Sequence, residues 1–346
     1  MRSRPRRTVS RPQPLARVSG LGDLAAIVPY LLGFSPHESV TCVGMTGSGA
    51  GSWGRRVGLT ARVDLAAVLD PVAAPLLLDS VFDGMGRTEA TAVVAIVSSE
   101  AETLDPVVVE QVRAAAGRAG LELLDVGWHR GEVCRSLLCD DPLCCPPSGV
   151  PVDPASPAAA TATFAGVAVL PDRAAVEAEF AVSTPGEALD PLIAGREADM
   201  LRAVVQGDGD DEVAAAAERV LALARDLDAR ATFGAPVPAM TDEVVADCVA
   251  SLAHVGVRDA VWIAVDAREV HGQGLWLELA RRAPAPYGAS PMFLLGWRSW
   301  RHGDGVRAVL AAERADATPG GYSAARLLLD AIGACVDPRS VPLLSA

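Results

Sequence analysis

Four cysteines lie close together in the stretch CRSLLCDDPLCC, at positions 134, 139, 144 and 145. Thiolates bind zinc and other thiophilic metals, and structural zinc sites usually draw on cysteines two to four residues apart. The four-residue spacings around Cys139 fit that pattern, whereas the adjacent side chains of Cys144 and Cys145 are expected to diverge. His129 is then a candidate replacement ligand. A metal site, with zinc as the ion, is one hypothesis for Cys139, Cys144 and Cys145.

Three other interpretations of the cysteine stretch stay open. A disulfide between Cys139 and Cys144 would close the short DDPL turn, although a reducing cytoplasm opposes it. A reactive thiol needs nearby positive charge, and Asp140 and Asp141 supply the opposite sign. The third interpretation is a turn packed by small, half-buried thiols.

A second group of candidates lies at the ends of two expected strands. Arg62 and Asp64 are two residues apart at the end of the strand expected over 57–63, so their side chains share a face. Glu38 immediately precedes the strand expected over 39–45. Arg62 and Asp64 could form a structural ion pair or contact an anion or substrate. Since α/β folds bind ligands at strand ends, we predict a ligand site at Glu38, Arg62 and Asp64 beside the cysteine loop.

Other common sites are disfavoured. The glycine-rich stretch at 47–51 precedes a strand, whereas a phosphate loop needs the N-terminus of a helix, so a hairpin tip is expected. The sequence contains no G-x-S-x-G, H-E-x-x-H or kinase motif. The five histidines are scattered, with His37 and His129 the most interesting of them. No catalytic residue is assigned, and whether the protein is an enzyme stays open.

The elements that must position these residues form an α/β layer in the first half of the chain. Helical spacing of Leu24, Ile27 and Leu31 predicts a helix over 21–32 that ends at Gly33. Apolar and alternating runs predict strands, and proline and glycine mark a helix over 106–119. The expected strands span 39–45, 57–63, 92–97 and 121–128, with a further helix over 70–85. A strand–helix–strand unit follows, so the fold class is α/β or α+β with a small mixed sheet.

The second half of the chain is predicted to be helical. Expected helices span 172–180, 188–206, 212–231, 241–255, 259–268, 275–282, 290–302, 304–315 and 323–336. The acidic stretch GDGDDE at 207–212 is expected to be a loop between helices. Trp297 followed by small residues and then Pro319 has a weak tetratricopeptide-like texture, but one such unit also fits an ordinary helix hairpin. We therefore expect a disordered basic tail over 1–17, an α/β domain over 18–150 that ends in the cysteine and proline loop, an α-helical domain over 151–337 and a tail over 338–346.

Composition restricts partners and location. The net charge of −13 argues against general binding to nucleic acid or to an anionic membrane. No apolar run approaches the length of about 18 residues that a membrane helix needs. Seven cysteines in 346 residues do not resemble a secreted disulfide scaffold. A cytoplasmic protein without a membrane span is expected.

Four segments resemble a known family. LGDLAAIVPYLLGFSPHESV, RVDL and CDDPLCCPPSGVPVD, together with the late segment GWRSWRHGDGVRAVLAAERADATPGGYSAARLL, are similar to the actinobacterial family with domain of unknown function 4192. The resemblance covers about residues 18–336. It implies a fold and an actinobacterial source, and no reaction. Cys134 departs from the family pattern, which favours aromatic residues there, and this weakens a four-cysteine site more than a role for Cys139, Cys144 and Cys145.

Two functions follow as hypotheses. The absence of a catalytic motif and the repeat-like texture favour a non-enzymatic interaction or regulatory protein whose helical half binds a protein partner. The alternative is an enzyme or small-ligand-binding protein with a site on the α/β layer beside the cysteine loop.

Overall fold

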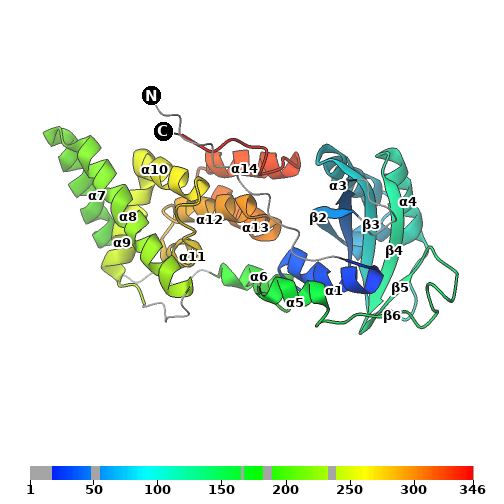
Figure 1. The fold of residues 1–346 in the computed structure, drawn as a ribbon. Coiled ribbons are helices and arrows are strands. Elements are labelled where there is room, and N and C mark those ends of the chain that lie inside the picture. The colour runs from blue at the N-terminus through cyan, green and yellow to red at the C-terminus, as the bar shows by residue number, and fades with distance from the viewer. Residues whose placement is uncertain (1–17, 48–54, 165–166, 182–188, 233–238, 346) are drawn as a thin grey trace, which may run out of the picture. The chain divides into compact units, whose positions relative to one another are not determined.

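A computed structural model describes residues 18–47, 55–164, 167–181, 189–232 and 239–345. The chain divides into two compact units, Met1–Asp172 and Arg173–Ala346, which we call the α/β unit and the helical unit (Figure 1). The predicted class is confirmed, because a small mixed sheet with helices precedes a helical half. The sequence placed the division at residue 150, earlier than the contacts do. The predicted basic tail over 1–17 lies outside the described residues.

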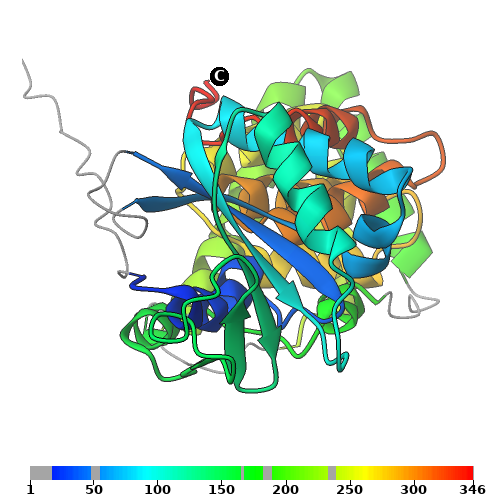
Figure 2. The same ribbon diagram turned by 90° about the vertical axis from the view of Figure 1, so that its right-hand side faces the viewer.

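The α/β unit is built on a six-stranded sheet with the order β2-β1-β3-β4-β5-β6 (Figure 2). Its strands are β1 (Ser39–Thr46), β2 (Arg56–Asp64), β3 (Ala90–Ser98), β4 (Glu122–Arg130), β5 (Val133–Ser136) and β6 (Val150–Pro151). Only β3 and β4 pair in parallel, through the crossover helix α4 (Val107–Arg118), and the other neighbours are antiparallel. The carboxyl ends of β3 and β4 therefore meet at one edge of the sheet.

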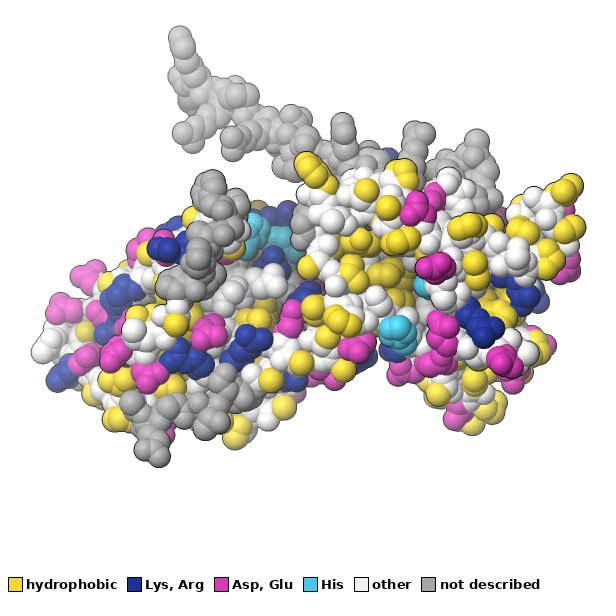
Figure 3. Space-filling model, turned by 90° about the horizontal axis from the view of Figure 1, so that it is seen from below, with side chains coloured by type: hydrophobic (Ala, Val, Ile, Leu, Met, Phe, Trp, Pro, Cys, Tyr) yellow, Lys and Arg dark blue, Asp and Glu magenta, His cyan; other side chains and the backbone are white. Residues whose placement is uncertain are grey.

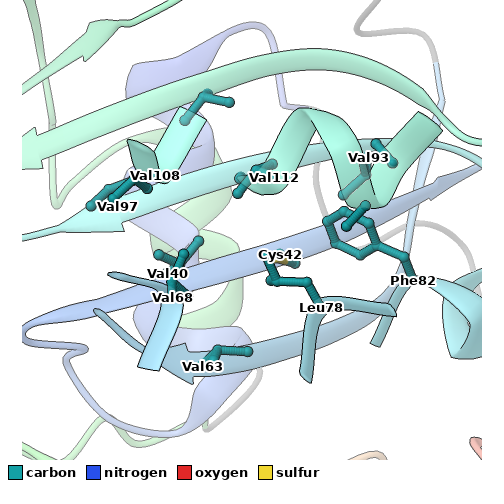
Figure 4. Close-up of a cluster of buried hydrophobic side chains, with 14 of the residues drawn as sticks. Val40, Cys42, Val63, Val68, Leu78, Phe82, Val93, Val97, Val108 and Val112 are labelled. Carbon is teal, nitrogen blue, oxygen red and sulfur yellow. The ribbon is translucent and has the colours of Figure 1, made fainter. Parts of the chain in front are cut away.

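One face of the sheet is covered by α2 (Leu65–Leu69), α3 (Ala73–Arg87) and α4. Val40, Cys42 and Val97 point from the strands toward Phe82 of α3 and Val112 of α4 in a fully buried cluster (Figure 4). Alternate strand residues point to opposite faces, so Ser39, Thr41, Ile96 and Ser98 lie on the other face. The predicted helix over 70–85 is thus α3, with the short α2 before it.

Helix α1 (Leu21–Leu32) packs against the other face of the sheet. A Cβ atom on Gly127 of β4 would lie 3.1 Å from Leu21 Cδ2, so α1 sits close against this strand. Gly33 ends α1 in the left-handed conformation with φ 79°, as its position predicted. α5 (Pro157–Phe164) packs on α1, and the hydroxyls of Tyr30 and Thr163 are 2.9 Å apart.

The helical unit contains a larger set of helices. They are α6 (Arg173–Glu179), α7 (Leu189–Gln206), α8 (Gly209–Thr232), α9 (Asp242–Ala253), α10 (Val255–Asp266), α11 (Gln273–Arg282), α12 (Ala289–Arg301), α13 (Gly305–Asp316) and α14 (Ser323–Gly333). α12 is buried along nearly its whole length and forms a hairpin with α13. Gly296 allows close packing, because a Cβ there would lie 3.2 Å from Ala308 O. The hairpin fits the simpler expectation, and a repeat array stays a prediction.

The acidic stretch at 207–212 is not wholly the predicted loop. Asp210, Asp211 and Glu212 form the first turn of α8. Acidic side chains stabilise that end of a helix because it carries partial positive charge. Acidic and arginine side chains are interspersed over the face of the molecule that Figure 3 shows.

Within the described ranges, each helix taken singly is too short or too polar to cross a bilayer. The pair α9 and α10 meets the length and composition criteria together, but the two helices bend by 97° at their junction.

Candidate functional site

The cysteine loop brings three sulfur atoms together. The Sγ atoms of Cys139, Cys144 and Cys145 all lie within 4.8 Å of one another, and those of Cys144 and Cys145 are 3.8 Å apart. All seven cysteines are free thiols in the structure. The side chains of the adjacent pair therefore do not diverge as the sequence suggested. A disulfide between Cys139 and Cys144 stays a prediction.

Backbone hydrogen bonds of the loop explain this convergence. The N–H groups of Cys144 and Cys145 both donate to Asp141 O, at 3.1 and 2.7 Å. Ser136 Oγ at the end of β5 accepts a hydrogen bond from the N–H of Cys139 at 3.0 Å. The loop thus winds into a turn after Asp141 that carries the last two cysteines back toward the first.

The electrostatics at Cys145 disfavour a free thiolate. Burial, followed by contacts with the thiols of Cys139 and Cys144, raises the pKa of Cys145 to about 12. A thiol with this pKa is protonated at neutral pH and is a poor nucleophile. This pKa gives no support to a reactive Cys145, and the expected effect of Asp140 and Asp141 stays a prediction.

A cavity of about 380 Å³ adjoins the cysteine loop. Its walls come from the N-terminus of α1, from β4 and β5, and from the loop leading to β6. The residues that line it include Gly22, Asp125, Cys134, Ser136, Cys144 and Cys145. Ser136 Oγ donates to Asp125 Oδ1 at 2.7 Å, yet burial dominates and raises the pKa of Asp125. The cavity thus joins a thiol cluster to a half-buried carboxylate and an N-terminal helix turn.

Cys134 lines the cavity but is separate from the three-cysteine cluster. It lies on β5 opposite His129 of β4, and its side chain is fully buried. Burial, with a smaller contribution from the charge of Asp125, raises its pKa to about 12. Neither Cys134 nor His129 joins the cluster of potential ligands found among the described residues.

Gly22 fixes the wall that α1 contributes to the cavity. A Cβ atom at this position would lie 2.5 Å from Pro151 O, which belongs to the backbone of β6. We expect Gly22→Ala to lower the free energy of unfolding of the α/β unit by about 1–3 kcal/mol, because backbone has to shift. Chemical denaturation measures the loss. Gly86→Ala on α3 is the control, since its Cβ meets open space, and an equal loss in both variants would contradict the prediction.

The second group of candidates meets where β1 begins and β2 ends. Arg62 Nη1 pairs with Asp64 Oδ1 at 2.7 Å, and Arg62 Nη2 donates to His37 O at 3.3 Å. Glu38, with φ 39°, turns its carboxylate toward Ser99, whose Oγ donates to Oε1 at 2.9 Å. The ion pair that the sequence offered as one alternative is therefore formed. Glu38, Arg62 and Asp64 are neighbours, but they do not line the cavity beside the cysteine loop.

His129 is the penultimate residue of β4 and lies in the same neighbourhood. Its carbonyl accepts a hydrogen bond from the N–H of Ser99, and its imidazole is close enough to His37 and Glu100 to feel their charges. Burial lowers the pKa of His129, and His37 lowers it further, against opposing contributions from the Gly131 backbone and from Glu100. The imidazole is therefore neutral at pH 7 and can donate or accept a proton.

Sequence reasoning missed the hydroxyl side chains beside these residues. Ser39 and Thr41 are fully buried in β1, and Ser98 is 3% exposed at the end of β3. The alternation of polar and apolar residues in SVTCV is the signal that could have found them, because it places both hydroxyls on one face. Asp125 and Ser136 carried no comparable signal, since only the pairing of β4 with β5 brings them together.

Comparison with known families gives one match. The model of a family described as "Domain of unknown function (DUF4192)" matches residues 22–339. Searches of curated proteins and of solved structures found no match.

Proposed function

The chain belongs to the DUF4192 family, a domain of unknown function, and from its geometry we propose that the α/β unit is a zinc-dependent binding protein for a small molecule. The observation that carries the proposal is the convergence of the Cys139, Cys144 and Cys145 sulfurs beside the cavity. Their thiolates would hold the ion, and the cavity would admit its remaining ligand.

The sulfur positions suit zinc. With Zn–S bonds of about 2.3 Å, two sulfurs of a tetrahedron lie about 3.8 Å apart. The Cys144 and Cys145 sulfurs have this separation, and Cys139 Sγ lies within 4.8 Å of both. A bound cation would also stabilise the deprotonated thiols, which otherwise repel one another.

The donor set leaves a position for an exchangeable ligand. Among the described residues the cluster of potential ligands contains three side chains, and zinc in proteins takes four ligands. Sites with three protein ligands and one exchangeable ligand are the ones that zinc enzymes use. Because Cys144 and Cys145 line the cavity, a small molecule with an oxygen, nitrogen or sulfur donor can reach the ion from there.

The surroundings of the cluster also fit. Three thiolates and one Zn²⁺ carry a net charge of −1, and the N-terminal turn of α1 in the cavity wall carries partial positive charge. No side chain caps that turn, so its N–H groups are not consumed by the N-cap residue. The site is therefore better suited to a metal thiolate than to three free thiolates.

The metal content of the full chain tests the proposal. We expect about one zinc per chain after purification without chelator under reducing conditions, measured by elemental analysis together with titration of accessible thiols. Each of Cys139→Ser, Cys144→Ser and Cys145→Ser should weaken zinc binding at least about tenfold, since even indirect changes around a zinc site cost about 10–100-fold. Cys335→Ser is the matched control, because this free thiol lies outside the cluster.

The contrary results are equally specific. Seven titratable thiols with no bound metal, even after zinc is added, would overturn the proposal. A mass two units lower with two thiols blocked would instead establish the disulfide interpretation.

The hypothesis of an interaction protein keeps the status of a prediction. Leu201, Val204 and Val205 are 65%, 52% and 80% exposed at neighbouring positions of α7, next to the buried Met200. This stripe is the feature of the helical unit that suits a protein partner, but it does not identify one. The small-molecule proposal is preferred because a defined cluster and a defined cavity support it.

A further inference from the structure

A row of polar side chains crosses the sheet on the face against which α1 packs, and it ends at His129, which is aligned with Cys134 of β5. Ser39 of β1 is aligned with Asp64 of β2 on one side and with Ser98 of β3 on the other. Ser98 is aligned in turn with His129 of β4. Aligned residues of paired strands share a face, so these four side chains lie side by side.

The hydroxyls of this face are buried without partners. Ser39 Oγ, Thr41 Oγ1 and Ser98 Oγ make no hydrogen bond with any residue that the structure describes. Ser39 and Thr41 are 0% exposed, and Ser98 is 3% exposed. Buried polar atoms in native proteins are nearly always hydrogen-bonded, so several orphans on one face require an explanation.

Arg62 brings a positive charge to the same place. Thr41 is aligned with Arg62 across β1 and β2. The two terminal nitrogens of Arg62 are engaged by Asp64 and by His37 O, whereas its Nε is buried and has no partner in the described part of the chain. One N–H donor of a guanidinium is therefore available on the residue aligned with Thr41, whose own hydroxyl has no partner among the described residues.

The acidic side chains nearby do not accept hydrogen bonds from these hydroxyls or from Arg62 Nε. The Glu38 carboxylate accepts hydrogen bonds from Ser99 Oγ at 2.9 Å and from the N–H of Glu100 at 3.2 Å. Asp64 forms an ion pair with Arg62 Nη1, and the Asp64 side chain is 65% exposed. The groups left without partners are one cationic N–H and three hydroxyls, all of which can donate.

The geometry points to a second ligand site, in which Arg62 Nε and the hydroxyls of Ser39, Thr41 and Ser98 bind the oxyanion of a small molecule, a phosphate or a carboxylate. Oxyanions accept several hydrogen bonds at once, and charge-assisted bonds from arginine are the strongest of these. The site lies at the carboxyl ends of the parallel strands β3 and β4, where α/β folds bind ligands. It is independent of the proposed zinc centre.

Titration of the full chain with inorganic phosphate and, separately, with acetate tests this inference. Isothermal titration calorimetry at constant ionic strength, with chloride as the reference anion, should show binding of at least one of the two. Arg62→Gln and Thr41→Val should each weaken binding about tenfold, which is the effect of one lost hydrogen bond to a charged group. Thr91→Val is the matched control, because Thr91 is an exposed residue of β3, and it should leave the affinity unchanged.

Thermal unfolding distinguishes a ligand site from a damaged fold. Thr41→Val replaces an unpartnered buried hydroxyl with a methyl group of similar size, so we expect the ligand-free variant to melt at an equal or higher temperature although it binds the oxyanion more weakly. Cys144→Ser should bind phosphate with unchanged affinity, which separates this site from phosphate coordinated to zinc. Absence of binding of both anions, or unchanged affinity in Arg62→Gln and Thr41→Val, would overturn the inference.

Discussion

Replacing Asp266 with alanine is expected to lower the free energy of unfolding of the helical unit by about 3–5 kcal/mol, the usual effect of leaving a buried charge without its partner. Asp266 ends α10 and has a side chain that is 0% exposed, and its partner Arg301 at the end of α12 is 6% exposed. Arg301 Nη2 donates to Asp266 Oδ2 at 3.0 Å, and its Nε donates to Oδ1. The variant would bury an unpaired guanidinium.

This pair also holds the end of the chain. Arg301 donates to the carbonyls of Val341 and Pro342 at 2.9 and 3.0 Å, and Asp266 Oδ2 accepts from the N–H of Leu344 at 2.7 Å. The segment expected to be a tail over 338–346 is thus held by hydrogen bonds up to Leu344, while residue 346 lies outside the described residues. Asp266→Ala should therefore increase amide exchange in this segment before the rest of the unit unfolds.

A matched control separates this pair from ordinary surface pairs. Asp226 and Arg230 form an ion pair within α8 whose side chains are 53% and 42% exposed. Asp226→Ala should cost at most about 0.5 kcal/mol, as for exposed helix pairs. Chemical denaturation of both variants measures the difference, and a loss below about 1 kcal/mol for Asp266→Ala would contradict the argument, since that is the range of exposed pairs.

The pH dependence of stability follows from the same contacts. Burial raises the pKa of Asp266, but hydrogen bonds from Arg301, the Leu344 N–H and Trp297 outweigh it, and the net pKa lies below the ordinary value. A lowered folded-state pKa adds stability above the unfolded-state pKa of about 4, and that stability is lost as the pH falls toward the folded-state pKa. In Asp266→Ala this part of the acid sensitivity should disappear.

The comparison of sequence with structure shows which signals are local. The helix over 21–32 was predicted with its observed ends because both the apolar spacing and the stop at Gly33 lie within the segment itself. β5 and β6 were missed because they are short and exist only through pairing with β4 and with each other. α5 was missed because the surrounding prolines suggested a boundary, whereas its alanines pack against α1.

For the candidate sites too, the residue types were evident from the sequence, whereas their arrangement in space depends on the fold. The sequence identified Cys139, Cys144 and Cys145 from residue type alone, but the hydrogen bonds to Asp141 O that bring their sulfurs together depend on the conformation of the turn. It also identified Glu38, Arg62 and Asp64 at the strand ends. It could not show that Thr41 is aligned with Arg62 and Ser39 with Ser98, because strand order and register decide this and β1 pairs with both β2 and β3.

The second large effect is expected in the core of the α/β unit, where Phe82→Ala should lower the free energy of unfolding by about 3–5 kcal/mol. Phe82 of α3 is fully buried in the cluster that joins α3 and α4 to β1 and β3. Truncation removes the apolar contacts of the ring and leaves a cavity that the packed strands cannot close. Leu76→Ala is the control on the same helix, because Leu76 is 71% exposed, and its effect should stay within about 0.5 kcal/mol.

The location of the damage tests whether the two units have separate cores. The buried cluster around Phe82 consists entirely of residues of the α/β unit, so hydrogen exchange should increase in β1, β3 and α4 and stay unchanged in α12 and α13. The proposed oxyanion site lies on the sheet that this cluster supports, and the cysteine loop directly follows its strand β5. Zinc and oxyanion binding should therefore weaken together in Phe82→Ala, whereas Asp266→Ala should leave both intact. Equal exchange in the two units of Phe82→Ala would show instead that they unfold as one.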